Sequence, residues 1–153
     1  MKFNREFLSY GYEMDVHPDV RVNQKDPKVN CAWLVLKVIK DNLNINLLEN
    51  YFGRYSIIEL INDEHNFKTL KFSTDDLKNH DIILFQTRYP ASKNMHIGIY
   101  LGELQNGEPM ILHSSYTTNG VIYEKLSQTC NYRTPKYNNQ RFLPIYIKRL
   151  IQS

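Results

Sequence analysis

The clearest periodic pattern of the chain lies in residues 30–39, where apolar residues recur at helical spacing. They fall at i, i+3, i+4 and i+7, the pattern of one buried helix face: Cys31, Leu34, Val35 and Val38. Asn30 comes just before them, and its side chain can accept a hydrogen bond from an amide of the first turn. The pattern predicts a helix that begins at Cys31 and ends near residues 41–42.

Three weaker helices are predicted around this one, over residues 3–14, 44–51 and 57–62. The last of them has a capping box, because Glu59 follows Ser56 at the required distance of three residues. Residues 15–30 contain two prolines and many Asp, Asn and Lys residues, which indicates an irregular loop leading into the Cys31 helix. Such loops often line a functional site.

The second half of the chain changes to alternating or short continuous apolar runs, which are typical of strands. The predicted strands cover residues 82–85, 95–101, 110–114, 121–123 and 141–151, and a brief extended segment is expected at residues 70–72. Asn-Gly pairs at 106–107 and 119–120 predict tight turns between strands. Pro144 indicates an edge or a bulge in the last strand. Residues 127–140 are polar, and an irregular segment is expected there.

Helices followed by strands predict an α+β fold, with N-terminal helices packed on an antiparallel sheet of about five strands. The length of 153 residues favours one domain, 1–153. Within it we expect an N-terminal segment and cleft loop (1–29), a helical part (30–66) and a β-meander (69–151).

Composition excludes several classes of function. The net charge of +3, with Lys and Arg scattered, is too small to favour nucleic acid. Apolar runs are too short for a membrane span. The charged N-terminus does not resemble a signal peptide, so we expect a cytoplasmic protein, or one exported by a non-classical route. Export would involve a dedicated secretion machinery or an immunity partner. The oligomeric state stays open.

Two histidines change the interpretation of Cys31. His96 and His113 lie on strands joined by one hairpin, and a pairing centre near residues 105–106 puts His113 opposite residue 98. That position is diagonal to His96 on the same face, within side-chain reach. A thiol at a helix N-terminus, a histidine base and a group that orients the base are what a cysteine nucleophile requires. The helix dipole and an ion pair with histidine both lower a thiol pKa.

Other interpretations of these residues remain open. Cys31 could be only a small buried apolar residue. Cys31, His96 and His113 could bind zinc, although no fourth ligand is evident. We therefore expect no metal and no cofactor. Cys130 lies in a polar segment and is expected to be non-catalytic, and His80 is expected in a turn.

Five segments resemble the NlpC-type family of papain-like cysteine peptidases. They are Asn-Cys-Ala-Trp-Leu-Val at 30–35, the stretch 76–85 with Asp-Ile-Ile-Leu-Phe at its end, His-Ile-Gly-Ile-Tyr-Leu-Gly at 96–102, Ile-Leu-His-Ser-Ser at 111–115 and Gly-Val-Ile-Tyr at 120–123. The resemblance covers roughly residues 29–126, and the chain is identified as a divergent member. It departs from the family pattern at Trp33, where glycine is usual, and it lacks the upstream Tyr-x-x-Gly-Gly segment.

The resemblance implies a papain-like fold and a role for each matching residue. Cys31 would be the nucleophile, with its backbone N–H as one oxyanion donor. His96 would be the general base and acid, and His113 would orient it. Tyr10, Tyr12 and Gln24 are candidates for a second donor or for the pocket, and we expect Tyr12, Trp33 and Ser114 to contact the substrate.

The resulting hypothesis is a thiol-dependent amide hydrolase, a cysteine peptidase or amidase that works through an acyl-enzyme. Its substrate would be a peptide or amide, and the resemblance implies peptidoglycan stem peptides. Two alternatives stay open: an acyltransferase or transpeptidase that uses the same acyl-enzyme with another acceptor, and a catalytically silent binding protein of this fold.

Overall fold

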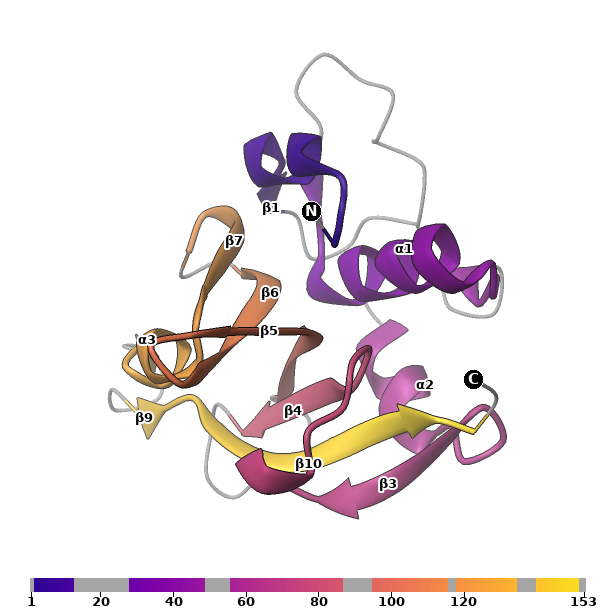
Figure 1. Ribbon diagram of the computed structural model, residues 1–153. Coiled ribbons are helices and arrows are strands. Elements are labelled where there is room, and N and C mark those ends of the chain that lie inside the picture. Colours follow the sequence, from indigo (N-terminus) through magenta and orange to yellow (C-terminus); the bar gives the residue numbers. More distant parts are fainter. Residues whose placement is uncertain are drawn as a thin grey trace.

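The computed structural model describes residues 2–12, 28–48, 56–86, 95–115, 118–134 and 140–151. Its main feature is a six-stranded antiparallel sheet with the strand order β3-β10-β4-β5-β6-β7 (Figure 1). The strands are β3 (Phe67–Lys71), β4 (Ile82–Gln86), β5 (Met95–Gln105), β6 (Glu108–Ser115), β7 (Gly120–Lys125) and β10 (Leu143–Leu150). The expected antiparallel sheet is therefore confirmed, with six strands in place of about five.

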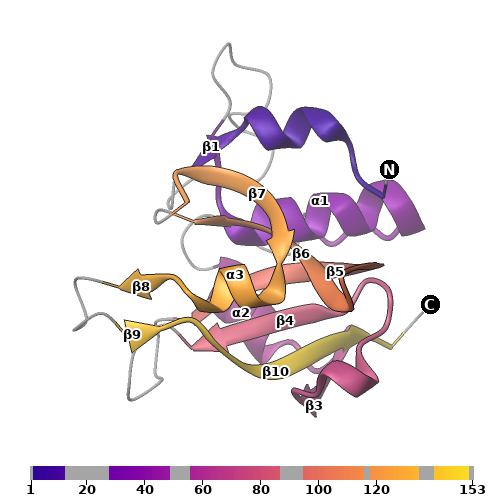
Figure 2. The same ribbon diagram turned by 60° about the vertical axis from the view of Figure 1, so that its left-hand side comes forward.

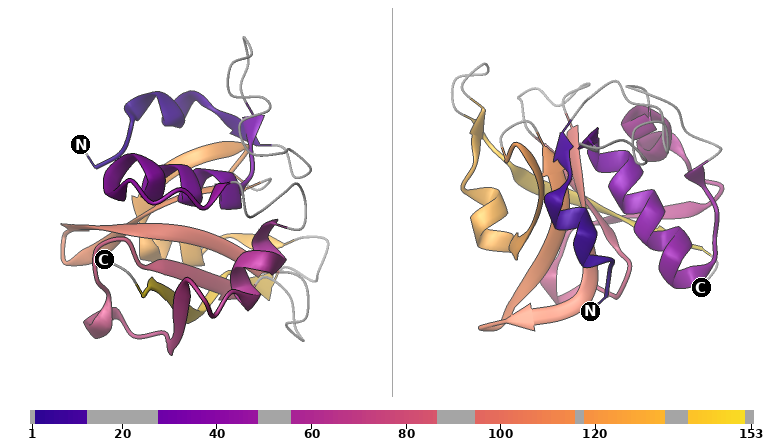
Figure 3. Two further views of the ribbon diagram at one scale, coloured as in Figure 1. Left: turned by 90° about the vertical axis from the view of Figure 1, so that its right-hand side faces the viewer. Right: turned by 90° about the horizontal axis from the view of Figure 1, so that it is seen from above.

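Helices lie on both sides of this sheet. Helices α1 (Cys31–Leu43) and α2 (Ser56–Asn62) lie on one side, and the short helix α3 (Leu126–Cys130) lies on the other (Figures 2 and 3). Smaller elements complete the fold: the 3₁₀ helices η1 (Arg5–Ser9) and η4 (Thr74–Asp76), the parallel pair β1 (Gly11–Tyr12) and β2 (Lys28–Val29), and the antiparallel pair β8 (Arg133–Thr134) and β9 (Gln140–Arg141). The mixture of helices on an antiparallel sheet confirms the α+β class.

The strands do not all follow one another as a meander. Strands β4 to β7 do, but β10 returns and lies between β3 and β4. Pro144 does not lie on an edge strand. It lies at a register shift where β10 pairs with β4, so of the two predicted possibilities, an edge or a bulge, the bulge is confirmed. A proline has no N–H to donate to a strand ladder, and an irregularity accommodates it.

Helix α1 forms as its sequence predicts. The Asn30 side chain accepts a hydrogen bond from the Trp33 amide at 2.7 Å, and Asn44 ends the helix in the left-handed conformation with φ 57°. Apart from Lys37, residues 31–39 are buried against the sheet and the N-terminal segment. The cap fixes where the helix begins, and this places Cys31 in its first turn.

Three predictions about local structure need correction. Within residues 3–14, residues 5–9 form η1 and residues 11–12 form β1, because Asn4 caps a short 3₁₀ turn and Gly11 already lies in a strand; residues 13–14 lie outside the described residues. Of the helix predicted over residues 44–51, residues 44–47 are not helical, since Asn44 ends α1, whereas Leu48 has 3₁₀ conformation; residues 49–51 lie outside the described residues. Residues 127–140 include most of α3 together with β8 and the first residue of β9, which the polar composition did not reveal.

The sheet separates two apolar clusters. Ile97, Ile99 and Leu101 of β5 belong to the cluster with α1, while Tyr100 belongs to the cluster on the α3 side. Successive side chains of a strand point to opposite faces, so His96 points to the α3 side of the sheet. In the part of the chain described here, no helix combines the length and apolar character needed to cross a membrane.

Candidate active site

The thiol of Cys31 lies where the first turn of α1 meets the beginning of β5. Its side chain is 8% exposed. Backbone N–H groups of Ile97, Cys31 and Ala32 are oriented toward Sγ. Because Ile97 directly follows His96, the sulfur lies against the peptide that joins the two residues. The structure thus brings Cys31 to the start of the histidine strand.

The ring of His96 is buried between aromatic side chains. Its centroid lies 5.8 Å from that of Phe85, its partner on β4, and 5.2 Å from that of Phe142. Burial, together with the neighbouring His113, holds the pKa of His96 well below its usual value. At neutral pH the imidazole is therefore uncharged and able to accept a proton.

His96 and His113 are in direct contact, as the strand pairing predicts. Nε2 of His96 lies 2.9 Å from Nδ1 of His113. The pairing of Ile99 with Leu112 places His113 opposite Gly98, which is the predicted diagonal. A β-carbon on Gly98 would lie 3.2 Å from Cβ of His113 and 2.6 Å from the Ile111 side chain, so glycine leaves the space that both side chains occupy.

The contact between His96 and His113 depends on a bulge in β5. The turn at Asn106-Gly107 pairs Leu104 with Pro109, and an unbroken ladder from there would put His113 opposite Tyr100. Instead the register shifts by two residues around Gly102, whose φ is +80°, a conformation that glycine adopts without strain. The bulge keeps every side chain on its face and moves His113 into reach of His96.

The chain of contacts continues to a residue that the sequence did not reveal. Nε2 of His113 lies 2.7 Å from Oε2 of Glu124, a buried carboxylate on β7. The correct strand register would have indicated this contact. His113 is paired with Ile122, and Glu124 lies two residues further along β7, so it is the diagonal neighbour of His113 on the same face. The turn predicted at 119–120 would have put Leu126 opposite His113, four residues away from the observed partner, and this concealed the contact.

The thiol pKa differs from the expectation. Burial raises the pKa of Cys31 to about 11, although the amides of Ile97, Cys31 and Ala32 act in the opposite direction. Removal of water from around the sulfur therefore outweighs the helix N-terminus. Both pKa shifts favour an uncharged thiol and an uncharged imidazole at neutral pH over a thiolate–imidazolium pair.

Two of the three residues expected to contact the substrate are fully buried, which disfavours such a contact. The Trp33 indole is 0% exposed and packs against Phe7 and Tyr10, so it belongs to the core. Ser114 is also fully buried, and it points to the opposite side of β6 from His113. Tyr12 is partly exposed and pairs with Val29, two residues before Cys31, so its role stays a prediction.

The other candidates are placed as follows. The Tyr10 side chain is buried, which disfavours it as an oxyanion donor, and Gln24 lies outside the described residues. Cys130 ends α3 and is free and half-buried. His80 lies in a turn with φ 74°, as predicted.

The residues present do not favour a metal at these histidines. Both ring nitrogens of His113 already have protein partners, His96 and Glu124. Across the described segments, no group of three or more His, Cys, Asp or Glu side chains is arranged to hold an ion.

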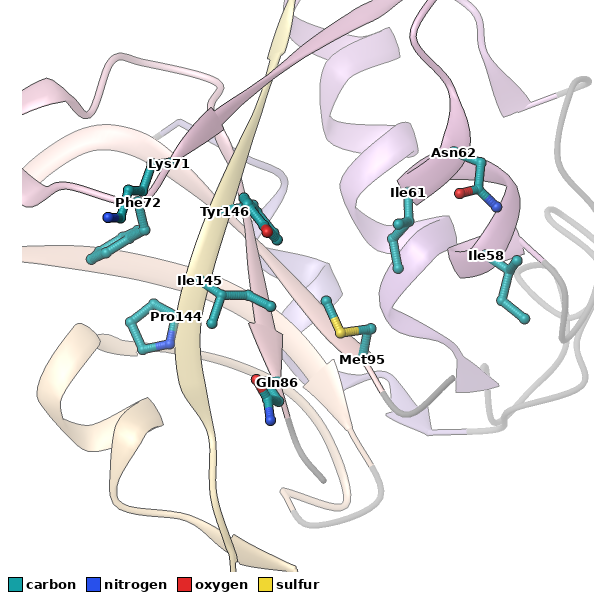
Figure 4. Close-up of a pocket in the computed structure, with 10 residues that line it drawn as sticks. All are labelled: Ile58, Ile61, Asn62, Lys71, Phe72, Gln86, Met95, Pro144, Ile145 and Tyr146. Atoms are coloured by element: carbon teal, nitrogen blue, oxygen red, sulfur yellow. The ribbon is translucent and has the colours of Figure 1, made fainter. Parts of the chain in front are cut away.

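A groove of about 710 Å³ lies between α2 and the sheet (Figure 4). Its lining is mainly apolar, and its residues come from α2, the ends of β3, β4 and β5, and β10: Ile58, Ile61, Asn62, Lys71, Phe72, Gln86, Met95, Pro144, Ile145 and Tyr146. Met95 directly precedes His96, so the groove and the histidine share the beginning of β5.

Two crystal structures are similar to this chain. An N-acetylmuramoyl-L-alanine amidase from Bacteroides uniformis ATCC 8492, solved at 1.15 Å, is 16% identical and aligns over 92% of this chain and 94% of that chain, with a TM-score of 0.44. A second structure under the same name and from the same organism, at 1.30 Å, is 19% identical and aligns over 92% of this chain and 58% of that chain, with a TM-score of 0.33. A search among curated proteins finds no match.

The sequence profile of one family matches most of the chain. The NlpC/P60 family profile matches residues 19–140, a range that includes Cys31, His96, His113 and Glu124. This range is wider than the segments in which the sequence motifs are recognised, and it extends through α3 to the first residue of β9. The chain therefore belongs to the NlpC/P60 family.

Proposed function

We propose that this protein is a cysteine amide hydrolase that cleaves peptide bonds of peptidoglycan through an acyl-enzyme. Membership of the NlpC/P60 family supports a peptidase or amidase. The observation that carries the cysteine mechanism is that the Cys31 thiol lies against the Ile97 amide, directly after His96, and that His96 contacts His113. This arrangement supports the assignment of a nucleophile, a base and a group that orients the base.

The first half of the reaction forms the acyl-enzyme. Nδ1 of His96 takes the proton of the Cys31 thiol as the sulfur attacks the carbonyl carbon of the scissile amide. The backbone N–H of Cys31, in the first turn of α1, donates to the developing oxyanion. The carbon–nitrogen bond then breaks, and the proton on Nδ1 passes to the leaving amine. The product of this half is a thioester on Cys31.

The second half restores the enzyme. Water enters, His96 takes one of its protons, and the hydroxyl oxygen attacks the thioester carbonyl. The carbon–sulfur bond breaks, the sulfur regains the proton from Nδ1, and a carboxylic acid leaves. His113 keeps Nε2 of His96 engaged throughout, so the other ring nitrogen faces the reaction in both halves.

The test is digestion of purified peptidoglycan, with the released fragments identified by mass spectrometry. We expect new free carboxyl and amino ends with the wild type, and loss of turnover by at least about 10³-fold with Cys31→Ala. Cys130→Ala is the matched control, because it removes the other free thiol and should keep full activity. Equal activity of Cys31→Ala and the wild type would refute the proposal.

The same assay separates hydrolysis from acyl transfer. Water as the acceptor gives a carboxylic acid, whereas an added amine would appear as a new amide if an acyltransferase were at work. An amide product that dominates over the acid at low amine concentration would replace the hydrolase with a transferase while keeping Cys31 as the nucleophile.

A further inference from the structure

Behind the two histidines lies a buried carboxylate held from three sides. Glu124 is 6% exposed, and its Oε2 lies 2.7 Å from Nε2 of His113. Thr129 of α3 donates its hydroxyl to Oε2 at 3.1 Å, and the Tyr132 hydroxyl donates to Oε1 at 2.9 Å. Strand β6, helix α3 and the segment after it thus converge on one carboxylate that the proposed acyl-enzyme mechanism does not yet use.

The direction of the hydrogen bonds follows from the chemistry of that carboxylate. An ionised carboxylate only accepts, so Nε2 of His113 carries a hydrogen and donates it. Nδ1 of an uncharged His113 then has a lone pair, and it accepts from Nε2 of His96. His96 therefore carries its hydrogen on Nε2 and keeps a lone pair on Nδ1. A base for the Cys31 thiol needs that tautomer.

We propose that Glu124 is a positioning residue that sets the tautomers of His113 and His96 and stabilises the charge that forms during attack. This inference rests on the proposed function. When the S–H bond of Cys31 breaks and an N–H bond forms at Nδ1, His96 becomes an imidazolium. Its positive charge is then linked through His113 to the negative charge of Glu124. The proton stays on His96 until it leaves with the amine.

The surroundings of the carboxylate favour this role over a purely structural one. Among the described residues, the basic side chain that contacts Glu124 is His113, whereas the buried Asp81 is paired with Arg149. The groups that face the pair are His96 from β5, Thr129 from α3 and the Tyr132 ring, with Cys130 near enough to sense the Glu124 charge. A buried carboxylate is costly unless it is paired and hydrogen-bonded, and the partners of Glu124 tie it to the two histidines.

The direct test is nitrogen-15 NMR of the two imidazoles, because it reports which ring nitrogen carries hydrogen even if no substrate is turned over. In the wild type we expect hydrogen on Nε2 of both His96 and His113. In Glu124→Gln we expect a mixture of tautomers at both histidines, since a carboxamide both donates and accepts. The kcat and the rate of Cys31 alkylation should fall about 100-fold with KM little changed.

Glu108→Gln is the matched control. Glu108 lies at the beginning of β6 and accepts from the Ser127 amide of α3, so the variant loses the same charge near the same helix without touching the histidines. It should keep the wild-type tautomers and rates. Glu124→Asp keeps the negative charge but shortens the side chain by one methylene, which moves the carboxylate away from His113. Its tautomer populations and its rates should lie between those of the wild type and those of Glu124→Gln.

Two results would overturn the inference. One is a wild-type tautomer at His96 in both Glu124→Gln and Glu124→Asp. The other is a kcat in these variants that falls no further than in Glu108→Gln. Failure of the proposed function gives a different pattern, with wild-type protein inactive on peptidoglycan but the Glu124-dependent tautomers intact. If Glu124→Gln does not fold, Glu124→Asp decides by the same two measurements.

Discussion

Two buried polar networks lie in the same sheet, and they are built differently. One runs from His96 to His113 and Glu124 across strands β5, β6 and β7. The other is centred on β10, where the fully buried Lys148 donates to the Ile61 carbonyl, Glu64 and Thr69, at 2.9, 3.1 and 2.9 Å. Its neighbour Arg149 binds both carboxylate oxygens of the buried Asp81, at 2.9 and 2.7 Å.

The difference lies in how each network ends. The three hydrogens of the Lys148 ammonium match three acceptors, and the Asp81 oxygens also accept the Lys78 amide, so the β10 network closes on itself. The histidine network ends at the ring of His96, whose strand begins beside the Cys31 thiol. Burial and charge alone therefore do not distinguish a functional cluster from a structural one. In the proposed mechanism, the distinguishing feature is an end that lies near a nucleophile.

The largest loss of activity is expected at the His96 end of the histidine network. His96→Ala should lower kcat on peptidoglycan by about 10³-fold, since the base that takes the thiol proton is lost. The free energy of unfolding, measured by urea titration, should change much less than the activity. His65→Ala is the control, because that histidine is exposed and far from the network in sequence. Comparable losses of activity in both variants would contradict the comparison.

The pH dependence of Cys31 alkylation should show that the pair rests uncharged. The pKa of Cys31 is raised to about 11, so the thiolate is a minor form at neutral pH. Alkylation by iodoacetamide requires the thiolate, and its rate should therefore rise about tenfold per pH unit from neutral pH toward the thiol pKa. A thiolate–imidazolium pair would instead give a rate that is flat above acidic pH, and this result would refute the uncharged pair.

The same values set the expected pH range of catalysis. The pKa of His96 is held well below its usual value, so the base stays unprotonated through the neutral range. Activity should be level there and should fall only at acidic pH, as the imidazole gains a proton. An acidic limit centred at or above the usual histidine pKa would show that substrate binding or His113 changes the environment of His96.

Most of the fold and part of the site could be predicted from sequence, for local reasons. The helix at Cys31 is determined by its apolar period and by Asn30, which are both adjacent in sequence. The contact between His96 and His113 was predicted from one hairpin with a pairing centre near residues 105–106; the turn lies at residues 106–107, and the bulge around Gly102 restores the predicted partner. Short-range patterns of this kind are readable because each partner lies within a few residues of a turn.

What escaped prediction depends on long-range or irregular structure. The place of β10 between β3 and β4 depends on pairing between segments about 75 residues apart in the sequence. Glu124 was missed because the connection between β6 and β7 is longer than the Asn-Gly pair indicates. The raised thiol pKa depends on burial, which the N-terminal position in the helix does not reveal.

Within the β10 network, the larger loss of stability is expected at Arg149. Arg149→Met would leave the buried Asp81 carboxylate without its cation, and the free energy of unfolding should fall by about 2 kcal/mol. The expected decrease in the free energy of unfolding is moderate because the Arg149 side chain is partly exposed. Urea titration measures it, with Lys68→Met as the control on the exposed part of β3 beside it. Alkylation of Cys31 should keep its wild-type rate.

The smallest effect is expected at Lys148, although it is the most deeply buried cation described. Lys148→Met removes the cost of keeping an ammonium away from water and fills most of the same volume. What it leaves behind is an exposed Glu64, which water can solvate, and a carbonyl and a hydroxyl that each lose one partner. Loss of stability should therefore stay below about 1 kcal/mol. A loss larger than that of Arg149→Met would mean that the ammonium organises α2 against the sheet, and that the β10 network does more than satisfy its own charges.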